Sequence, residues 1–245
     1  MHVVVNAAQS VDGKLATRRR EQLRISGPED FDRVDRVRAA ADAVLVGVGT
    51  VLADDPHLTL EEEDRRVQRL RNGRPGNPAR VVVDSAGRTP TDARILDDEA
   101  TTYLLVGGAT PDDRRKRLES SGAEVIVAGT DPRSDEDAHA KSSTEDARET
   151  GRSGSERVDL VAGLDALGER GVDRLMVEGG GEVIFSLFEA GLVDELSVYV
   201  GSLVIGGREA PTLADGEGFI DDFPTLDLVE TERIDDGVVL SYEVG

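Results

Sequence analysis

Four short motifs in this sequence place glycine beside a hydroxyl or a charged side chain, directly after an apolar, β-branched run. In the strongest, residues 175–185 (LMVEGGGEVIF), Glu178 ends a predicted buried strand and a helix is predicted from about Glu182. Three glycines join them: Gly179, Gly180 and Gly181. Glycines let a backbone approach a phosphate closely, and free N–H groups at a helix start bind anions. The motif therefore indicates an anion-binding turn. The simpler alternatives are ordinary turn chemistry and a Glu178 that only interacts with the neighbouring helix N-terminus.

The second motif follows the predicted strand at residues 44–48 and reads GVGTVLADDP over residues 47–56. Its hydroxyl and carboxylate, Thr50 and Asp54, could hydrogen-bond a ligand. From spacing alone a capped turn is favoured, in which Asp54 and Asp55 accept hydrogen bonds from backbone N–H groups.

The other two motifs also follow strands. After the first strand, Asp12-Gly13 is a turn signal, and Lys14 either binds a phosphate or is simply solvated. After the run at residues 80–83, an acidic residue could meet a ribose hydroxyl, and Arg88 could meet a 2′-phosphate. Because carboxyl ends of parallel strands share one edge of a sheet, we expect all four motifs to form a single site there.

The elements that must position these motifs alternate between strands and helices. Strands are predicted at residues 3–5, 44–48, 80–84, 103–106, 124–127, 174–177 and 195–200, and a closing antiparallel pair at 226–229 and 238–242. Helices are predicted at residues 114–120, 164–170 and 182–190, and another from Ser26, with Ser26 as its cap and Glu29 three residues later. This alternation predicts an α/β fold with a mixed sheet covered by helices on both faces.

Composition excludes several classes of protein. The 245 residues contain no cysteine, which rules out disulfide scaffolds, thiol nucleophiles and cysteine-ligated zinc, and three histidines do not favour a metal site. The net charge of −21 opposes nucleic-acid binding. No apolar run is long enough for a membrane span or a signal peptide, so a cytoplasmic protein is expected. The acidic, lysine-poor composition favours a cytoplasm with molar salt over an ordinary acidic enzyme.

One segment departs from the pattern. Residues 130–157 hold eight acidic and five basic residues, no aromatic residue, and alanine as the sole apolar type. Such a stretch cannot offset its ordering entropy, so it is predicted to be a mobile insertion in a single domain of residues 1–245.

In their order along the chain, the motifs resemble those of the riboflavin-biosynthesis pyrimidine reductases, especially the stand-alone archaeal and fungal type. The resemblance rests on SVDGK (10–14), RISG (24–27), GTVLADDP (49–56), VDS (83–85), VEGGG (177–181) and GLVDEL (191–196). It spans nearly the whole chain apart from residues 130–157. It implies a dihydrofolate-reductase-like fold, NADPH as hydride donor, a homodimer, and the same domain as the reductase half of bacterial bifunctional enzymes. The zinc deaminase motif of those enzymes is absent.

The resemblance also implies roles for individual residues. Cofactor contacts would come from Thr50, Asp54, Ser85, Arg88, Gly179, Gly180, Gly181 and Glu182, and substrate contacts from Gln22, Arg24, Arg38 and Glu178. Glu182 departs from the family, which often has a small or hydroxyl residue there, and its carboxylate would repel a pyrophosphate unless it turns outward or is screened by salt.

The implied reaction reduces the ribosylamino group of 2,5-diamino-6-ribosylamino-4(3H)-pyrimidinone 5′-phosphate to a ribitylamino group. The sugar must open to an imine before hydride reaches C1′. Glu178 is the first candidate to interact with the iminium, Lys14 the second as proton donor or phosphate contact, and Asp12 the third. A pterin or dihydrofolate reductase, a non-catalytic nucleotide-binding module and a structural dimerisation protein are the alternatives.

Overall fold

The computed structural model describes residues 1–21, 23–129 and 157–245, so the expectation for residues 130–156 lies outside the described part of the chain. The strands are β1 (His2–Ser10), β2 (Ala43–Gly47), β3 (Ala79–Val83), β4 (Thr102–Val106), β5 (Ala123–Val127), β6 (Arg174–Gly179), β7 (Glu195–Gly201), β8 (Leu226–Ile234) and β9 (Gly237–Val244). The helices are α1 (Pro28–Ala40), α2 (Val48–Asp54), α3 (Glu63–Arg71), α4 (Asp112–Ser120), α6 (Leu160–Gly168) and α7 (Gly181–Glu189), with a 3₁₀ turn η1 (Arg94–Leu96). None of the described helices is both long and apolar enough to cross a membrane.

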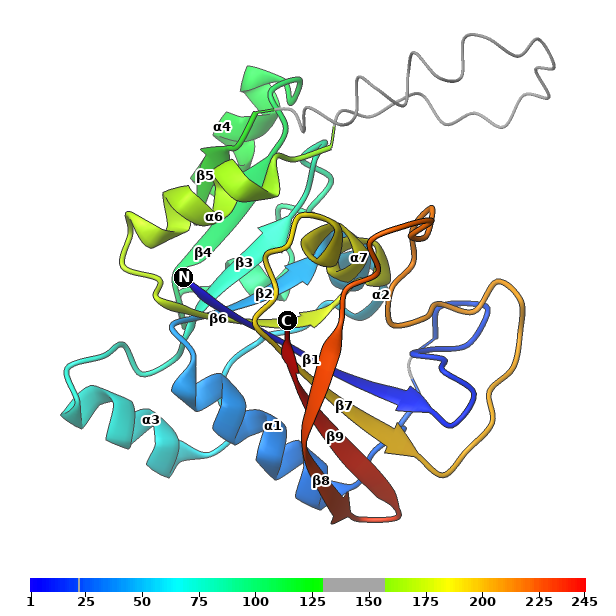
Figure 1. The fold of residues 1–245 in the computed structure, drawn as a ribbon. Coiled ribbons are helices and arrows are strands. Elements are labelled where there is room, and N and C mark those ends of the chain that lie inside the picture. The colour runs from blue at the N-terminus through cyan, green and yellow to red at the C-terminus, as the bar shows by residue number, and fades with distance from the viewer. Residues whose placement is uncertain (22, 130–156) are drawn as a thin grey trace, which may run out of the picture.

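All nine described strands form one mixed sheet in the order β5-β4-β3-β2-β6-β1-β7-β9-β8 (Figure 1). The strands from β5 to β7 pair in parallel, and the C-terminal β8–β9 pair adds antiparallel strands at one edge. The predicted mixed α/β sheet with a closing antiparallel pair is therefore confirmed. The chain runs from β1 through α1 to β2, and β6 inserts between these two strands. In open α/β sheets ligands bind beyond the carboxyl ends of the strands at such a reversal of strand order.

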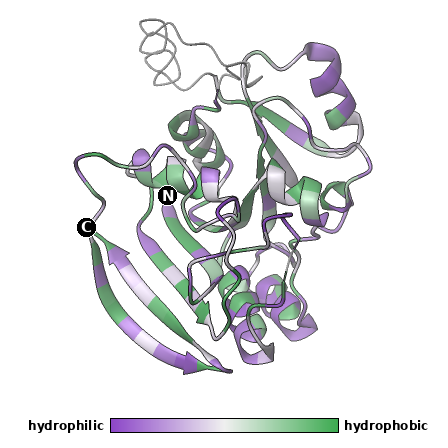
Figure 2. Ribbon diagram, turned by 90° about the vertical axis from the view of Figure 1, so that its right-hand side faces the viewer, coloured by the Kyte–Doolittle hydropathy of each residue, from purple (hydrophilic) through white to green (hydrophobic). Residues whose placement is uncertain are grey.

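Two apolar layers hold helices against opposite faces of the sheet. On one face, Val5, Leu45 and Leu175 of the sheet pack with buried residues of α6 and α7, such as Leu164 and Ile184. On the other face, a second layer joins sheet residues to helices α1, α2 and α4; it includes Val44, Val82, Leu104, Val34, Val51 and Leu118. Neighbouring residues of one strand therefore belong to opposite layers, as the strand period requires. Figure 2 shows apolar residues along the central strands and polar residues on the outer helices.

Helix α1 starts differently from its prediction. Ser26 is not the cap: the helix begins at Pro28 with Gly27 at the cap position and without a side-chain cap of its own. The carboxylate comes instead from the β8–β9 turn, where Asp235 accepts from the N–H groups of Glu29 (3.3 Å) and Asp30 (3.0 Å). A Cβ on Gly27 would overlap this carboxylate. The sequence rule failed here because the acceptor lies about two hundred residues away in the chain.

We expect Asp235→Gly to lower the free energy of unfolding by about 1–2 kcal/mol, because two N–H groups at the helix start lose a charged acceptor. Glycine is the proper replacement, since Asp235 has a φ of 53°. Asp222→Gly is a matched control: Asp222 is exposed and has the same φ of 53°. Urea denaturation of both variants checks the prediction, and equal midpoints would contradict it.

Candidate active site

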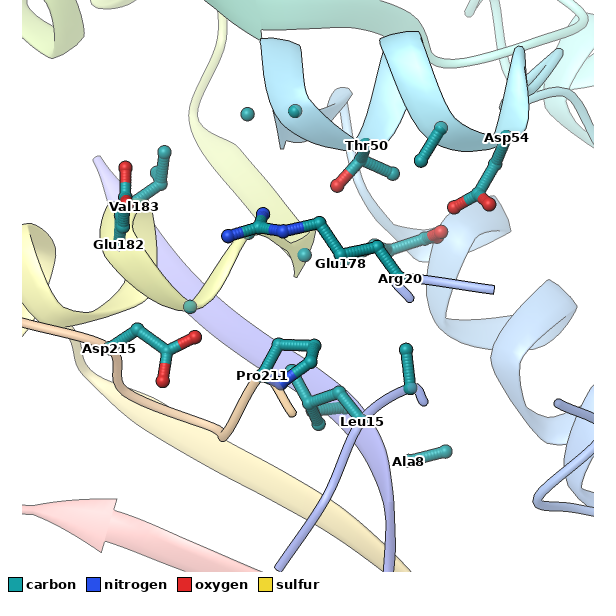
Figure 3. A pocket seen from close by; sticks show the side chains of 18 of the residues that line it. Ala8, Leu15, Arg20, Thr50, Asp54, Glu178, Glu182, Val183, Pro211 and Asp215 are labelled. Atoms are coloured by element: carbon teal, nitrogen blue, oxygen red, sulfur yellow. The ribbon is translucent and has the colours of Figure 1, made fainter. Parts of the chain in front are cut away.

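A pocket of about 940 Å³ opens at the carboxyl ends of β1, β2 and β6 (Figure 3). Its lining includes Ala7 and Ala8 of β1, residues 47–50 after β2, and residues 178–183 after β6. Residues of the segments 15–20, 23–26 and 211–215 complete the wall. The volume suits a medium-sized organic ligand, and the position is the one that the reversal of strand order favours.

The glycine turn at the start of α7 has two separate reasons for its glycines. Gly180 adopts a φ of +93°, which side chains rarely tolerate. A Cβ on Gly181 would lie 2.5 Å from the carbonyl oxygen of Thr212 and 2.8 Å from Oδ2 of Asp215. At Gly181 the protein's own backbone therefore requires glycine, which is a reason that the sequence did not indicate. The turn leaves the first N–H groups of α7 on the pocket wall, without a side-chain cap.

Glu178 and Arg38 form a bidentate ion pair at the back of the pocket. Nη2 of Arg38 lies 2.6 Å from Oε2 of Glu178, and Nε of Arg38 contacts the other carboxylate oxygen. The two side chains are 12% and 19% exposed for Glu178 and Arg38. Burial disfavours the charged form of Arg38, but the charge and hydrogen bonds of Glu178, with Asp35 and Glu61, raise its pKa above the ordinary value. Of the pair, Glu178 lines the pocket and Arg38 lies behind it.

The motif after β2 is a helix rather than the favoured capped turn. Helix α2 begins at Val48, and Thr50 and Asp54 are one turn apart, so they share the face that lines the pocket. Figure 3 shows both side chains on that wall. Asp55, the residue after the helix, does serve a backbone group: its Oδ1 accepts from the N–H of Arg94 at 2.8 Å. A seven-residue helix gives too short a period to be distinguished from a turn in the sequence.

Several predicted residues are not in the pocket lining. Nζ of Lys14 donates to the carbonyl oxygen of Ala210 at 3.3 Å. Asp12 holds the 203–206 loop, accepting from the N–H groups of Ile205 and Gly206 at 3.0 and 2.7 Å. Hydrogen bonds from Ser10 and from these N–H groups outweigh burial and lower the pKa of Asp12 to about 2. Both residues therefore make contacts that organise the loops around the pocket.

In the motif after β3, some residues line the pocket and others do not. Oγ of Ser85 accepts from the N–H of Val158 at 3.4 Å, outside the pocket lining. Asp84 is buried and bonds both the N–H and the hydroxyl of Thr89 at 2.7 Å, so it does not offer its carboxylate to a ribose. Arg88 does line the pocket, with Nε 3.9 Å from Oδ1 of Asp84. Gln22 lies outside the described residues.

Of the pocket residues with charged or aromatic side chains, three were not predicted as ligand contacts. Arg20 and Asp215 project toward the interior in Figure 3, and Phe31 is half-exposed at the wall, with the guanidinium carbon of Arg24 5.3 Å from its ring centroid. Arg20 sits in a run of three arginines in an arginine-rich chain, so its type carried no signal. Asp215 follows no strand and no recognisable motif.

Comparison with known proteins agrees with this geometry. The RibD C-terminal domain family matches residues 1–240. The 2,5-diamino-6-ribosylamino-4(3H)-pyrimidinone 5′-phosphate reductase of Archaeoglobus fulgidus is 43% identical over 98% of this chain and 96% of its own length. The reductase of the same name from Methanothermobacter thermautotrophicus is 39% identical, covering 99% and 98%. Riboflavin biosynthesis protein RibD of Actinobacillus pleuropneumoniae is 32% identical over 99% of this chain, which spans 57% of that protein.

Solved structures share the fold. A pyrimidine reductase-like protein from Corynebacterium diphtheriae superposes with a TM-score of 0.78 at 22% identity, covering 99% of this chain and 91% of its own. A deaminase/reductase from Thermotoga maritima gives 0.71 at 21% identity, covering 100% and 56%. The chain therefore belongs to the RibD C-terminal domain family. It is a reductase of riboflavin biosynthesis, which confirms the resemblance found in the motifs.

Proposed function

We propose that this chain is a single-domain reductase of residues 1–245 that converts 2,5-diamino-6-ribosylamino-4(3H)-pyrimidinone 5′-phosphate to its ribitylamino form with NADPH. The observation that carries the proposal is that the α7 glycine turn, the α2 face and Glu178 meet in one pocket. The substrate follows from the two archaeal relatives, which match over almost their whole length.

The described residues fit a dinucleotide phosphate cofactor. The start of α7 presents its first N–H groups to the pocket, without a side-chain cap among the described residues, and the helix dipole favours anions there. Thr50 and Asp54 line the opposite wall from α2, and Arg88 is 60% exposed, available to a 2′-phosphate. When bound, NADPH supplies the hydride, and the chain supplies binding and orientation. Ser85 stays a prediction from the resemblance, because its hydroxyl lies outside the pocket lining.

The chain's own residues act on the substrate sugar. Opening the ribosylamino ring breaks the bond between C1′ and the ring oxygen, with a proton delivered to that oxygen, and leaves a protonated imine at C1′. The carboxylate of Glu178, fixed by two hydrogen bonds from Arg38, is placed to stabilise positive charge on that imine. Addition of hydride to C1′ then completes the ribitylamino group. Lys14 does not reach the pocket, so the proton donor we propose is a water or substrate hydroxyl positioned by Glu178.

Incubation of the purified protein with the pyrimidine phosphate and NADPH tests the function. We expect loss of the reduced-nicotinamide absorbance and a ribitylamino product by mass spectrometry. Dihydrofolate in place of the pyrimidine tests the pterin alternative. Binding of NADPH without oxidation in the presence of any of these substrates would support a non-catalytic module instead.

We also propose a homodimer that buries the outer face of β8. Leu226, Leu228 and Val229 are 39%, 56% and 55% exposed on this edge strand. Ile220 and Phe223, in the segment that precedes β8, are also exposed. Exposed apolar side chains gathered in a patch are typical of a protein interface. A long exposed edge strand is also a site for pairing with another chain.

Leu228→Asp should therefore shift the protein to monomer, because a carboxylate would have to be desolvated in the interface. Val161→Asp is the matched control, since Val161 is 49% exposed on α6, away from β8. Analytical ultracentrifugation of both variants checks this. A dimer that survives Leu228→Asp, or a monomeric wild type, would contradict the proposed interface.

The net charge of −21 supports a further proposal, that the surface suits molar salt. At about 1 M salt the Debye length falls to roughly 3 Å, which screens repulsion between like charges. We expect the unfolding temperature to rise between dilute buffer and molar KCl. Full stability in dilute buffer would contradict adaptation to salt.

A further inference from the structure

The charges that line the pocket are unevenly paired. Four carboxylates and three arginines contribute: Asp54, Glu178, Glu182 and Asp215 against Arg20, Arg24 and Arg88. Glu178 is held by Arg38, and the carboxylate of Asp215 accepts from the N–H and hydroxyl of Thr212. A phosphorylated ligand at the α7 end of this pocket therefore needs a cation there to offset the carboxylates.

Arg20 is placed to be that cation. It lies in a tight turn in which its N–H donates to the carbonyl oxygen of Thr17 at 2.8 Å, with a φ of 61°. This strained turn aims the side chain across the pocket. Figure 3 shows the guanidinium in the interior, directed toward the start of α7 where Glu182 and Val183 lie. Its side chain has no hydrogen-bond or ion-pair partner within the described part of the chain.

Glu182 is the complementary feature. It lies in the first turn of α7, and its carboxylate also lacks a partner among the residues that the structure describes. A carboxylate here stabilises the helix dipole but competes with any phosphate for the same N–H groups. Two opposite charges that are unpaired among the described residues, Arg20 and Glu182, therefore face the same end of the pocket.

We infer that Arg20 is a phosphate-binding residue of this pocket, and that it offsets the repulsion by Glu182 at the start of α7. The inference rests on the proposed function, which brings two phosphorylated ligands to the pocket. The shared chemistry is a phosphate ester, supplied either by the dinucleotide or by the pyrimidine substrate. The guanidinium of Arg20 supplies positive charge at the start of α7. A phosphate bound there would meet both the helix N–H groups and the carboxylate of Glu182.

Two titrations separate the two sources. NADPH fluorescence in the absence of substrate gives the dinucleotide Kd, and steady-state rates at saturating NADPH give the KM of the pyrimidine phosphate. We expect Arg20→Met to raise one of these about tenfold, the scale of one charge-assisted hydrogen bond, and Arg20→Lys to raise it less. Glu182→Gln should lower the same constant by about threefold, since it removes an opposing charge near the surface. Arg19→Met is the matched control, because Arg19 is exposed, adjacent in sequence and outside the pocket lining.

The outcomes are distinct. A changed Kd assigns Arg20 to the dinucleotide, and a changed KM alone assigns it to the substrate. If wild type binds NADPH and turns over while Arg20→Met leaves both constants unchanged, the inference is wrong and the proposed function stands. If wild type neither binds NADPH nor reduces the pyrimidine phosphate, the proposed function and this inference both fail.

Discussion

Glu178→Gln lowers kcat on the order of a hundredfold or more, with the NADPH Kd close to that of wild type. This is the expected result because the amide keeps the shape of the carboxylate and removes its charge. It can accept one hydrogen bond from Arg38 but not both, so the pair that fixes the guanidinium is also broken. Single-turnover rates and NADPH fluorescence measure the two quantities separately.

If the role of Glu178 were purely structural, Glu178→Gln would not lower kcat selectively. Arg38→Ala is the informative companion, because it leaves the carboxylate in place while removing its partner. We expect this variant mainly to raise the substrate KM, because Arg38 holds Glu178 from behind the pocket lining and its loss frees the carboxylate that faces the pocket. An unaltered KM would mean that Arg38 does not position Glu178 for the substrate. Wild-type turnover in Glu178→Gln would remove Glu178 from the mechanism.

Gly181→Ala is expected to have the second-largest effect. The added Cβ would lie 2.5 Å from a backbone carbonyl oxygen, that of Thr212, which cannot move away as a flexible side chain does. Overpacking of this kind costs about 1–3 kcal/mol of stability. It also pushes residues 211–215 away from the start of α7, so NADPH binding should weaken at the same time.

Gly168→Ala is the matched control for this variant. Gly168 ends α6 and has open space around the position of a Cβ, so alanine there should be neutral or slightly stabilising. Thermal unfolding and NADPH titration of both variants check the prediction. Equal behaviour of the two would show that the 211–215 segment moves freely to accommodate a side chain.

Much of the sheet could be predicted because its strands are β-branched runs bounded by turn residues. The strands predicted at residues 80–84 and 174–177 correspond to β3 and β6 with small shifts at their ends. The four motifs after strands could be assigned to one edge by topology alone. Which side chains then enter the pocket could not, because Ser85 and Lys14 share that edge with Thr50 but bond backbone groups outside the pocket lining.

The features that escaped prediction depend on partners far away in the sequence. The reason for glycine at position 181 is a carbonyl group at Thr212, and the cap of α1 is Asp235. The position of Arg20 depends on a loop turn in which its φ is positive. No propensity rule assigns a positive φ to arginine. Sequence rules describe neighbours along the chain, and these contacts arise once the sheet has brought distant segments together.

The attachment of Asp235 to α1 makes the last hairpin part of the catalytic unit. Arg38 stands in the last turn of the helix whose first turn Asp235 holds. Truncation before β8 would remove Asp235 and leave the first turn of α1 without its acceptor. The position of the helix, and of the Arg38 guanidinium in its last turn, would then be less well fixed. Shortened versions of this chain should accordingly lose reductase activity even though every residue lining the pocket is retained.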